Sequence, residues 1–495
     1  MILRRQPRRQ VTFFVLAATA AALCAAPSPA QLRADATSEL TPLDHYVASP
    51  DPHYRWEVVH DGEGELDGKA YSFQIVDLTS QAWLTAEQVD RPVWKHWLVV
   101  VVPAEIEHDT AMLFIGGGSN DDPMPEAPSP LIVAPALATG SITAELRMVP
   151  NQPITFAGDE FGPRKEDELI AYGWDQFLRG GARDHDALWL ARLPMTKAAV
   201  RAMDTLQAMF PGEGGQSRLS GFVVAGGSKR GWTTWTTAAV DDRVVAIAPM
   251  VIDLLNVEPS FQHHWRAYGF WAPAVYDYRR EGIMEWQGRP EYRRLLEITE
   301  PYSYRQRLAE IPKYLINAAG DEFFLPDSWK FYWHELPGEK HLRYVANGNH
   351  SLAGTDVAES FVGFYRSVLE DGTRPEVDWS AEDGVIVVRT DPGKPPTKIE
   401  LWTATNPTRR DFRVVTIKRT WEAEEIAPRQ DGVYRLEIAE PEEGWKAAFV
   451  ELTYAGEGPE PMKVTTGTLV VPETLPFPEY EPDRSDLPAP AGSSN

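Results

Sequence analysis

The sequence contains a single cysteine, Cys24, among 495 residues. One cysteine cannot form a disulfide within the chain, so a framework of disulfides is excluded. Stability must instead come from a large apolar core. The material for such a core is present, because 43% of the residues are hydrophobic and 11% are aromatic. This composition also excludes a chain that is disordered over most of its length.

Basic residues are scarce relative to acidic ones. The chain has 48 Lys and Arg against 72 Asp and Glu, a formal net charge of -24. A negative field repels phosphate backbones, so we expect no nucleic-acid partner. His263 and His264 are adjacent rather than spaced along one helix face, and there is no H-E-x-x-H motif, so we expect no metal and no cofactor.

The first thirty residues differ from the rest of the chain. Four arginines precede an apolar run at positions 11–24, and small residues follow it. This pattern predicts a secretory signal peptide over residues 1–30, with cleavage after Ala26 or after Ala30. The run is shorter than the 20 or so residues that a membrane span needs, and no later run is longer, so we expect no integral membrane segment in the mature chain. Cleavage after Ala30 would remove Cys24 and change the net charge from -24 to -28. The sequence therefore predicts a periplasmic or secreted protein.

The chain divides into regions with different patterns. Strands alternate with helices over residues 40–373, which predicts an α/β domain whose parallel sheet is covered on both faces. Within it, an aromatic-rich helical stretch at 257–310 is expected to lie over the sheet as a lid. Residues 374–471 show short alternating strands, one of them at 412–418, and predict an all-β sandwich. Residues 472–495 are rich in Pro, Glu and Asp and predict a disordered tail.

Ser228 follows a predicted strand and opens a predicted helix. The segment Gly226-Gly227-Ser228 matches the G-x-S-x-G elbow, a strained turn that raises a serine above a sheet. The match is incomplete because Arg230 occupies the position of the second glycine and Gly231 follows one residue later. A lone G-x-S is usually a plain turn.

Asp321 and His350 each lie just after a later predicted strand. Asp321 follows the strand at 313–319, and His350 follows the strand at 341–346. Alone, Asp321 is explained as a helix N-cap and His350 as an exposed loop residue. The chain order Ser, Asp, His, with each residue after a strand, is however typical of α/β-hydrolases. We therefore predict a catalytic triad of Ser228, Asp321 and His350. Asp253 and Asp327 are alternative acids at this stage.

Backbone N–H groups for an oxyanion are expected at two places. Gly117 and Gly118 lie in a Gly-Gly-Gly turn after an early strand, and Lys229 follows the serine. These three residues form the predicted oxyanion hole, although the glycine turn is also explained as a flexible connector. The Arg230 side chain is predicted to bind an anionic group of the substrate. A structural ion pair is the alternative for Lys229 and Arg230.

With these residues in view, the chain resembles the PhoPQ-activated pathogenicity-related protein family. The longest matching strings are residues 227–235, which read Gly-Ser-Lys-Arg-Gly-Trp-Thr-Thr-Trp, and residues 248–256, which read Ala-Pro-Met-Val-Ile-Asp-Leu-Leu-Asn. Shorter matches lie at 80–84, 94–97, 116–120 and 193–197. The resemblance covers residues 40–471 and implies an exported protein with an α/β-hydrolase fold and an appended β domain. The resemblance also implies that Arg230, the arginine after Ser228-Lys229, is a trait of the family.

The sequence thus predicts an exported serine hydrolase with a small-molecule ester or peptide as substrate. Ser228 would attack the carbonyl, His350 would act as general base and then acid, and Asp321 would orient His350. The alternative is a non-catalytic binding or signalling protein on the same scaffold, because a fold does not fix a function. The oligomeric state is left open.

Overall fold

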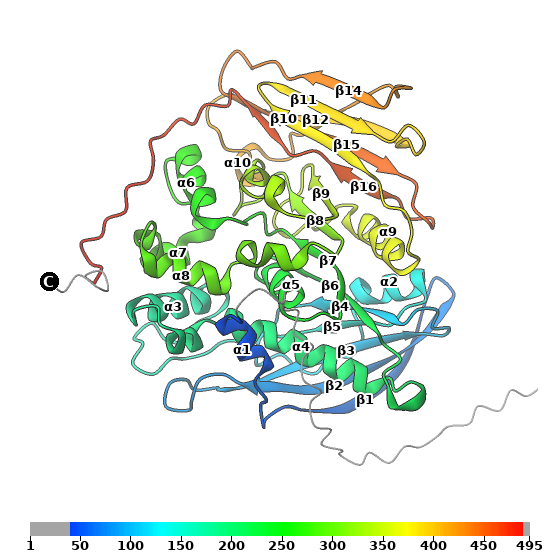
Figure 1. Ribbon diagram of the computed structural model, residues 1–495, viewed down its shortest axis with the longest axis vertical. Coiled ribbons are helices and arrows are strands. Elements are labelled where there is room, and N and C mark those ends of the chain that lie inside the picture. Colours follow the sequence, from blue (N-terminus) through cyan, green and yellow to red (C-terminus); the bar gives the residue numbers. More distant parts are fainter. Residues whose placement is uncertain (1–39, 489–495) are drawn as a thin grey trace, which may run out of the picture.

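A nine-stranded sheet forms the centre of the larger domain (Figure 1). The computed structural model describes residues 40–488, so the predicted signal peptide and residues 489–495 lie outside the described residues. The strand order is β1-β2-β3-β5-β4-β6-β7-β8-β9. The bounds are β1 (Arg55–Leu66), β2 (Lys69–Ala82), β3 (Val93–Pro103), β4 (Thr110–Ile115), β5 (Thr143–Leu146), β6 (Gly221–Gly227), β7 (Val244–Met250), β8 (Lys313–Ala318) and β9 (Lys340–Val345).

The pairing of neighbouring strands changes once across this sheet, from antiparallel to parallel. β1, β2 and β3 pair antiparallel, and β3 pairs antiparallel with β5, whereas β5, β4, β6, β7, β8 and β9 all run parallel. The parallel strands are almost fully buried, as their continuous apolar sequences predict. The chain passes from β4 out to β5 and then back to β6, so a switch point lies at the carboxyl ends of β4 and β6. Sheets of this kind bind their ligands at such a point.

Helices pack in two groups around the sheet. One group contains α1, α4 and α5, and the second contains α2 and α9. The sequence patterns missed β5, α2 and α3, because β5 has only four residues and α2 carries an internal proline. The bounds are α1 (Pro42–Ala48), α2 (Pro130–Thr139), α3 (Glu166–Arg179), α4 (Arg192–Met209), α5 (Lys229–Val240) and α9 (Val357–Leu369). None of the helices in residues 40–488 combines the length and the apolar character needed to cross a bilayer.

The segment 257–310 is helical, as predicted. It contains α6 (Val257–Tyr268), α7 (Tyr276–Arg280) and α8 (Pro290–Thr299), joined by short 3₁₀ turns. Several of its aromatic side chains have a structural role, since Trp271, Trp286, Tyr292 and Tyr304 are buried in the main core. We call this segment the lid, because it also contributes walls to the cavity described below.

Two antiparallel sheets form the C-terminal region, at the top of Figure 1. The first contains β10 (Val377–Glu382), β11 (Val385–Thr390) and β14 (Val433–Glu437). The second contains β12 (Lys398–Asn406), β13 (Glu422–Glu425), β15 (Trp445–Tyr454), β16 (Met462–Thr465) and β17 (Leu469–Val471). The predicted strand at 412–418 is wrong, because Val414–Ile417 form the short helix α10. The Asp411 carboxylate accepts hydrogen bonds from Arg413 N and Thr416 Oγ1 and so favours a turn there.

Residues 472–488 cross the lid and are not a disordered tail. Phe477 N donates to the Arg266 carbonyl at 3.1 Å, and Tyr480 N donates to Gln262 Oε1 at 3.0 Å. The Tyr480 ring packs against Trp265 and Trp271 of the lid, with ring centroids 4.8 and 5.0 Å away. Composition alone missed this path because a few anchoring contacts, rather than the average polarity, order the segment. We call residues 472–488 the strap.

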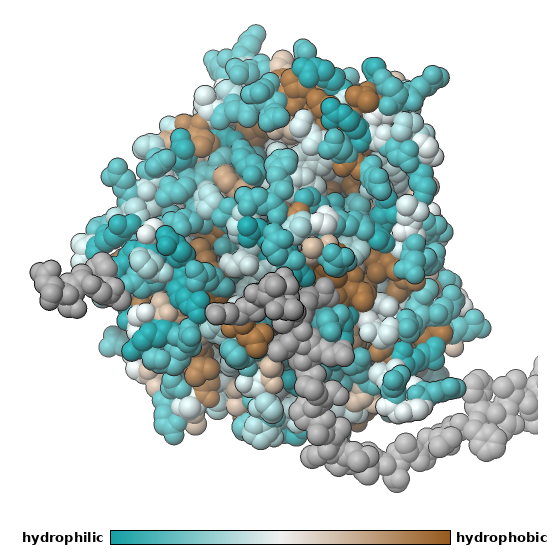
Figure 2. Space-filling view, in the orientation of Figure 1, coloured by the Kyte–Doolittle hydropathy of each residue, from teal (hydrophilic) through white to brown (hydrophobic). Residues whose placement is uncertain are grey.

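Polar side chains cover most of the molecular face in Figure 2, and hydrophobic ones occur there in small groups. Most apolar side chains belong instead to one continuous core that extends from the nine-stranded sheet into the C-terminal sheets. The two regions therefore form a shared interior.

A buried carboxylate links three parts of the chain. Asp327 lies after β8 and is 1% exposed. It contacts Arg410 of the C-terminal region at 2.5 Å, His263 of α6 at 2.9 Å and Lys330 at 2.8 Å. Burial by itself would raise the pKa of Asp327, but Arg410, His263 and Lys330 together hold that pKa well below its usual range.

Replacing Asp327 by asparagine should lower the free energy of unfolding by about 3 to 5 kcal/mol at neutral pH, because Arg410 would be left as a buried charge without its partner. The lowered pKa means that the carboxylate stabilises the fold above about pH 4, and that this contribution is lost as the pH falls through the folded-state value. The difference between wild type and Asp327→Asn in denaturant titrations should therefore shrink only in strong acid. Asp431→Asn, which removes an exposed partner of Arg429, serves as control and should leave the midpoint unchanged. Equal effects of the two variants would contradict this role.

Candidate active site

Ser228 occupies a strained turn between β6 and α5. Its backbone has φ 56° and ψ -125°, in a region that side chains rarely adopt. The Ser228 N–H donates to the Met250 carbonyl of β7 at 2.8 Å, and the Ser228 carbonyl accepts from Trp232 N of α5 at 2.9 Å. This is the geometry of the nucleophile elbow that the Gly-x-Ser pattern predicts. The turn places the serine at the carboxyl end of the parallel strands.

Asp321 and His350 lie together, at the ends of β8 and β9. His350 Nδ1 lies 2.9 Å from Asp321 Oδ2 and 3.0 Å from Asp321 Oδ1. The carboxylate is buried and also accepts hydrogen bonds from the N–H groups of Phe323 and Phe324, at 2.8 and 3.4 Å. Because Nδ1 faces a carboxylate, it carries the proton, and Nε2 is left as the basic nitrogen.

One small cavity extends from the serine to the two phenylalanines that follow Asp321. Ser228, Phe323 and Phe324 all line a cavity of about 30 Å³. Phe323 also packs on the His350 ring, with centroids 4.2 Å apart. Within residues 40–488 the Ser228 hydroxyl has no hydrogen bond to His350, a separation common in proteins without bound substrate. The lid closes the cavity with Val257, Phe261, Val275 and Tyr278.

The predicted oxyanion turn is rigid. Gly118 has φ 139°, and a side chain on it would lie 2.8 Å from Asp122 Oδ2. The turn is held by Met148 N, which donates to the Gly117 carbonyl at 2.8 Å, and by Gln152 Nε2, which donates to the Gly118 carbonyl at 2.9 Å. These contacts favour an ordered turn over the flexible-connector alternative. In the described part of the chain, the N–H groups of Gly117, Gly118 and Lys229 donate to no protein acceptor.

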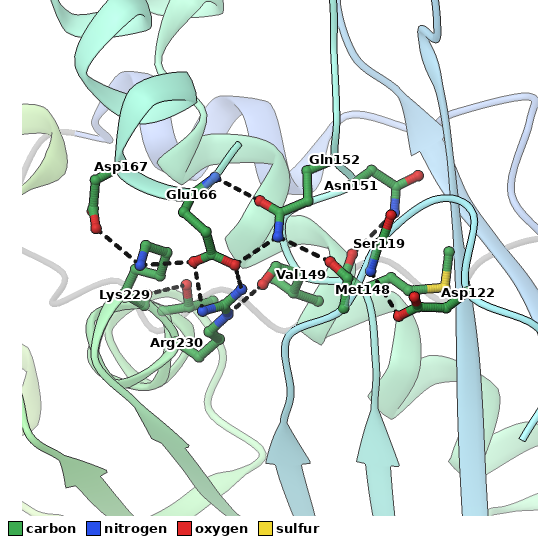
Figure 3. Close-up of polar contacts among 12 residues, drawn as sticks. Ser119, Asp122, Met148, Val149, Asn151, Gln152, Glu166, Asp167, Lys229 and Arg230 are labelled. Atoms are coloured by element: carbon green, nitrogen blue, oxygen red, sulfur yellow. Dashed lines mark hydrogen bonds and ion pairs between the residues drawn. The ribbon is translucent and has the colours of Figure 1, made fainter. Parts of the chain in front are cut away.

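Lys229 and Arg230 are both engaged in ion pairs, as Figure 3 shows. Glu166 bridges them: Lys229 Nζ lies 2.8 Å from Oε2, and the Arg230 guanidinium contacts both carboxylate oxygens at 2.8 and 2.6 Å. Lys229 also contacts Asp167 at 3.0 Å. Burial acts to raise the pKa of Glu166, but Lys229 and Arg230 lower that pKa to about 2. The geometry therefore favours the ion-pair alternative over substrate binding by Arg230.

The contacts of the Arg230 side chain explain why this position holds an arginine and not a glycine. Its Nε donates to the Val149 carbonyl at 2.5 Å, and its guanidinium lies directly against Gly117, where a Cβ would come within 2.8 Å of it. The side chain thus connects the start of α5 to the glycine turn. It fixes the distance between the two sets of predicted oxyanion donors.

A family comparison agrees with these features. The model of the PhoPQ-activated pathogenicity-related protein family matches residues 43–413, which is well over half of the chain. The chain belongs to this family. Autocrine proliferation repressor protein A of Dictyostelium discoideum is a relative that is 40% identical over 464 residues, covering 88% of this chain and 92% of that protein.

Solved structures with a similar fold include three hydrolases. Acetyl xylan esterase from Paenibacillus sp. R4 has a TM-score of 0.44 and 12% identity, over 66% of this chain and 92% of that one. Glucuronoyl esterase from Solibacter usitatus has a TM-score of 0.39 and 15% identity, over 66% and 91%. Acylaminoacyl peptidase from Pyrococcus horikoshii has a TM-score of 0.39 and 12% identity, over 67% and 52%. The strand order and the turn at Ser228 place this family member in the α/β-hydrolase fold.

The two alternative acids are engaged elsewhere in this family member. Asp327 belongs to the buried cluster with Arg410. Asp253 accepts a hydrogen bond from Tyr332 OH at 2.6 Å and another from Tyr344 OH. Burial raises the pKa of Asp253 to about 7. Among the three candidate acids, Asp321 is therefore the one that contacts His350.

The C-terminal region braces both loops that carry this pair. The Val414 N–H donates to the Gly320 carbonyl at 2.8 Å, next to Asp321. Asn347 Nδ2 donates to the Trp421 carbonyl at 3.0 Å, and Trp421 N donates back to Asn347 Oδ1 at 3.0 Å. The appended β region therefore holds the acid and histidine loops from outside the sheet.

Sequence reasoning missed Glu166, Asp167 and Arg192, which surround the start of α5. The two acids lie in a helix that the sequence pattern did not reveal. Arg192 was within a predicted helix, and its position among apolar residues was the available signal. A charge on an apolar helix face marks a buried site.

Gly231 supplies the close packing that the missing second glycine would provide. A Cβ at Gly231 would lie 2.9 Å from Ile252 Cγ2 and 3.0 Å from the carbonyl oxygens of Gly226 and Met250. At Gly227 the nearest atom would be 3.8 Å away, an ordinary contact. Gly231→Ala should therefore lower the free energy of unfolding by about 1 to 3 kcal/mol through overpacking.

The matched variant Gly227→Ala should unfold at nearly the wild-type temperature. Thermal unfolding followed by circular dichroism measures both variants. If Gly231→Ala were as stable as Gly227→Ala, the helix would not depend on this contact.

Proposed function

We propose that this protein is an exported serine hydrolase that cleaves an ester or peptide bond of a small-molecule substrate. The observation that carries the proposal is the buried Asp321 carboxylate on His350 Nδ1, beside a cavity that the strained Ser228 lines. Strain and a buried carboxylate on a histidine are costly features that persist where function uses them. Export is supported by the predicted signal peptide.

The reaction would proceed in two halves. Ser228 Oγ attacks the carbonyl carbon while His350 Nε2 takes its proton, and the carbonyl oxygen becomes an oxyanion. The N–H groups of Lys229 and of Gly117 or Gly118 would stabilise that charge. His350 then gives the proton to the leaving group, which departs and leaves an acyl-serine. Water attacks the acyl-serine with the same proton relay, and Ser228 is restored.

Asp321 has a positioning task in this scheme. It holds His350 in the tautomer with a basic Nε2 and stabilises the imidazolium that forms during the attack. Phe323, stacked on the ring, limits the rotation of His350. The lid shields the cavity from water, which strengthens the hydrogen bonds to the oxyanion.

A second candidate function comes from the relative in Dictyostelium discoideum. Its name describes an autocrine repressor of proliferation, which favours a secreted signalling protein on the same scaffold. A signalling role requires no reactive serine, so the two functions differ in the reactivity of Ser228.

A fluorophosphonate probe should label the purified wild-type protein, because the probe phosphonylates activated serines. The Ser228→Ala variant should not be labelled. Ser220→Ala, which alters an exposed serine at the opposite end of β6, should be labelled like wild type. Absence of labelling in wild type, or labelling of Ser228→Ala, would exclude this nucleophile and leave the signalling function.

Asp321→Asn should lower kcat for 4-nitrophenyl acetate by about 10⁴-fold, as replacement of the acid does in a serine-protease triad, because an amide favours the wrong histidine tautomer. Asp253→Asn is the matched control. Its kcat should stay near wild type, since the raised pKa leaves Asp253 partly protonated and an amide resembles that form. A larger loss for Asp253→Asn than for Asp321→Asn would reverse the assignment of the acid.

A further inference from the structure

Arg192 is a buried cation beside the serine, and within residues 40–488 it makes no ion pair. It is 3% exposed, begins α4 and lines the same cavity as Ser228. One Nη donates to the Lys229 carbonyl at 2.9 Å, and the guanidinium carbon lies 4.4 Å from the centre of the Trp232 ring. Its Nε has no hydrogen-bond partner. Among the described residues no carboxylate lies within ion-pair distance of it.

The charges around the cavity do not cancel. Glu166 and Asp167 form ion pairs with Lys229 and Arg230 through the contacts described above. Arg192 makes no direct ion pair, and the Asp167 carboxylate, which also lines the cavity, attracts it only from a greater distance. Tyr278, which lies beside the guanidinium, stays neutral because burial raises its pKa well above the usual value. The amino end of α5 adds further positive potential. An arginine stays protonated in proteins, so the group formed by Arg192, Lys229, Arg230, Glu166 and Asp167 carries one net positive charge.

The size and the walls of the cavity limit which ligand group can contact the Arg192 guanidinium. About 30 Å³ of space holds only a group of a few atoms, and most of its walls are apolar, among them Val257, Phe261 and Val275 of the lid. A buried unpaired charge in such surroundings is costly unless a ligand compensates it. A carboxylate is a small group, and its two oxygens match the planar fork of a guanidinium.

We propose that Arg192 binds a carboxylate on the acyl group of the substrate, so that the substrates are monoesters or monoamides of short dicarboxylic acids. This inference rests on the proposed function. Arg192 binds the carbonyl of Lys229, and the N–H of the same residue is an oxyanion donor in the proposed reaction. The guanidinium therefore lies next to the residue whose N–H would bind the substrate carbonyl, within reach of a second polar group of the same substrate.

The test compares two esters of equal chain length, mono-4-nitrophenyl succinate and 4-nitrophenyl butyrate. Wild type should show a kcat/KM at least about 10-fold higher for the succinate ester, since a hydrogen bond to a charged group is worth about 10- to 100-fold. Arg192→Met should lose about 10- to 100-fold on the succinate ester and stay within a few-fold of wild type on the butyrate ester. Equal losses on both esters, or a wild-type preference for butyrate, would overturn the proposal.

Two further variants distinguish a loss of carboxylate binding from a loss of folding. Arg201→Met removes another buried arginine of α4, one that pairs with Asp204 away from the cavity, and should keep the wild-type preference. Arg192→Lys keeps the charge and should show an intermediate preference because it lacks the planar fork. If Arg192→Met does not fold, a full wild-type preference in Arg192→Lys would overturn the proposal.

A binding measurement separates this inference from the hydrolase proposal. Succinate should bind the Ser228→Ala variant in calorimetry, and it should not bind the double variant Ser228→Ala, Arg192→Met. Binding that depends on Arg192 in a protein that fluorophosphonate does not label would retain the carboxylate site and exclude the hydrolase. Labelling of wild type together with no succinate binding to Ser228→Ala would exclude the carboxylate site and retain the hydrolase.

Discussion

The left-handed turn at Ser228 constrains much of the surrounding structure. It needs α5 to leave the sheet at once, and that is sterically possible only because Gly226 and Gly231 carry no side chains where helix and strands meet. The turn brings the amino end of α5 to the carboxyl ends of β4 and β6. Lys229 and Arg230 then enter the same small space, and the acidic start of α3 is required to neutralise them. The strained turn and the ion pairs beside it are thus one unit.

The site is assembled from three parts of the chain that hold one another. The sheet provides the serine, the acid and the histidine, the lid provides the far wall of the cavity, and the C-terminal region holds the loops after β8 and β9. Asp327 joins the same three parts beneath the surface. The appended β region is therefore part of the architecture around the candidate site, which distinguishes it from a module tethered by a linker.

The sequence predicted those features that depend on local patterns. Continuous apolar runs identified β6, β7, β8 and β9, and the residues after them identified Ser228, Asp321 and His350. The sequence favoured Asp321 but left Asp253 as an alternative, because the hydrogen bonds of Tyr332 and Tyr344 to Asp253 exist only in the fold. Average composition misjudged residues 472–488, where a few contacts of Tyr480 outweigh a polar sequence. The sequence left Arg230 with two possible roles, substrate binding and a structural ion pair. Its partner Glu166 begins α3, a helix that the sequence pattern did not predict.

The strap has a consequence for the order in which the protein is completed. A chain folds from its amino end as it is synthesised. The sheet and the lid are made well before residues 472–488, which are among the last to be joined. The contacts between the strap and the lid can therefore form only after the sheet and the lid have been synthesised. A chain that stopped at Val471 would contain every residue of the candidate site and still lack the contacts of Phe477 and Tyr480 with the lid.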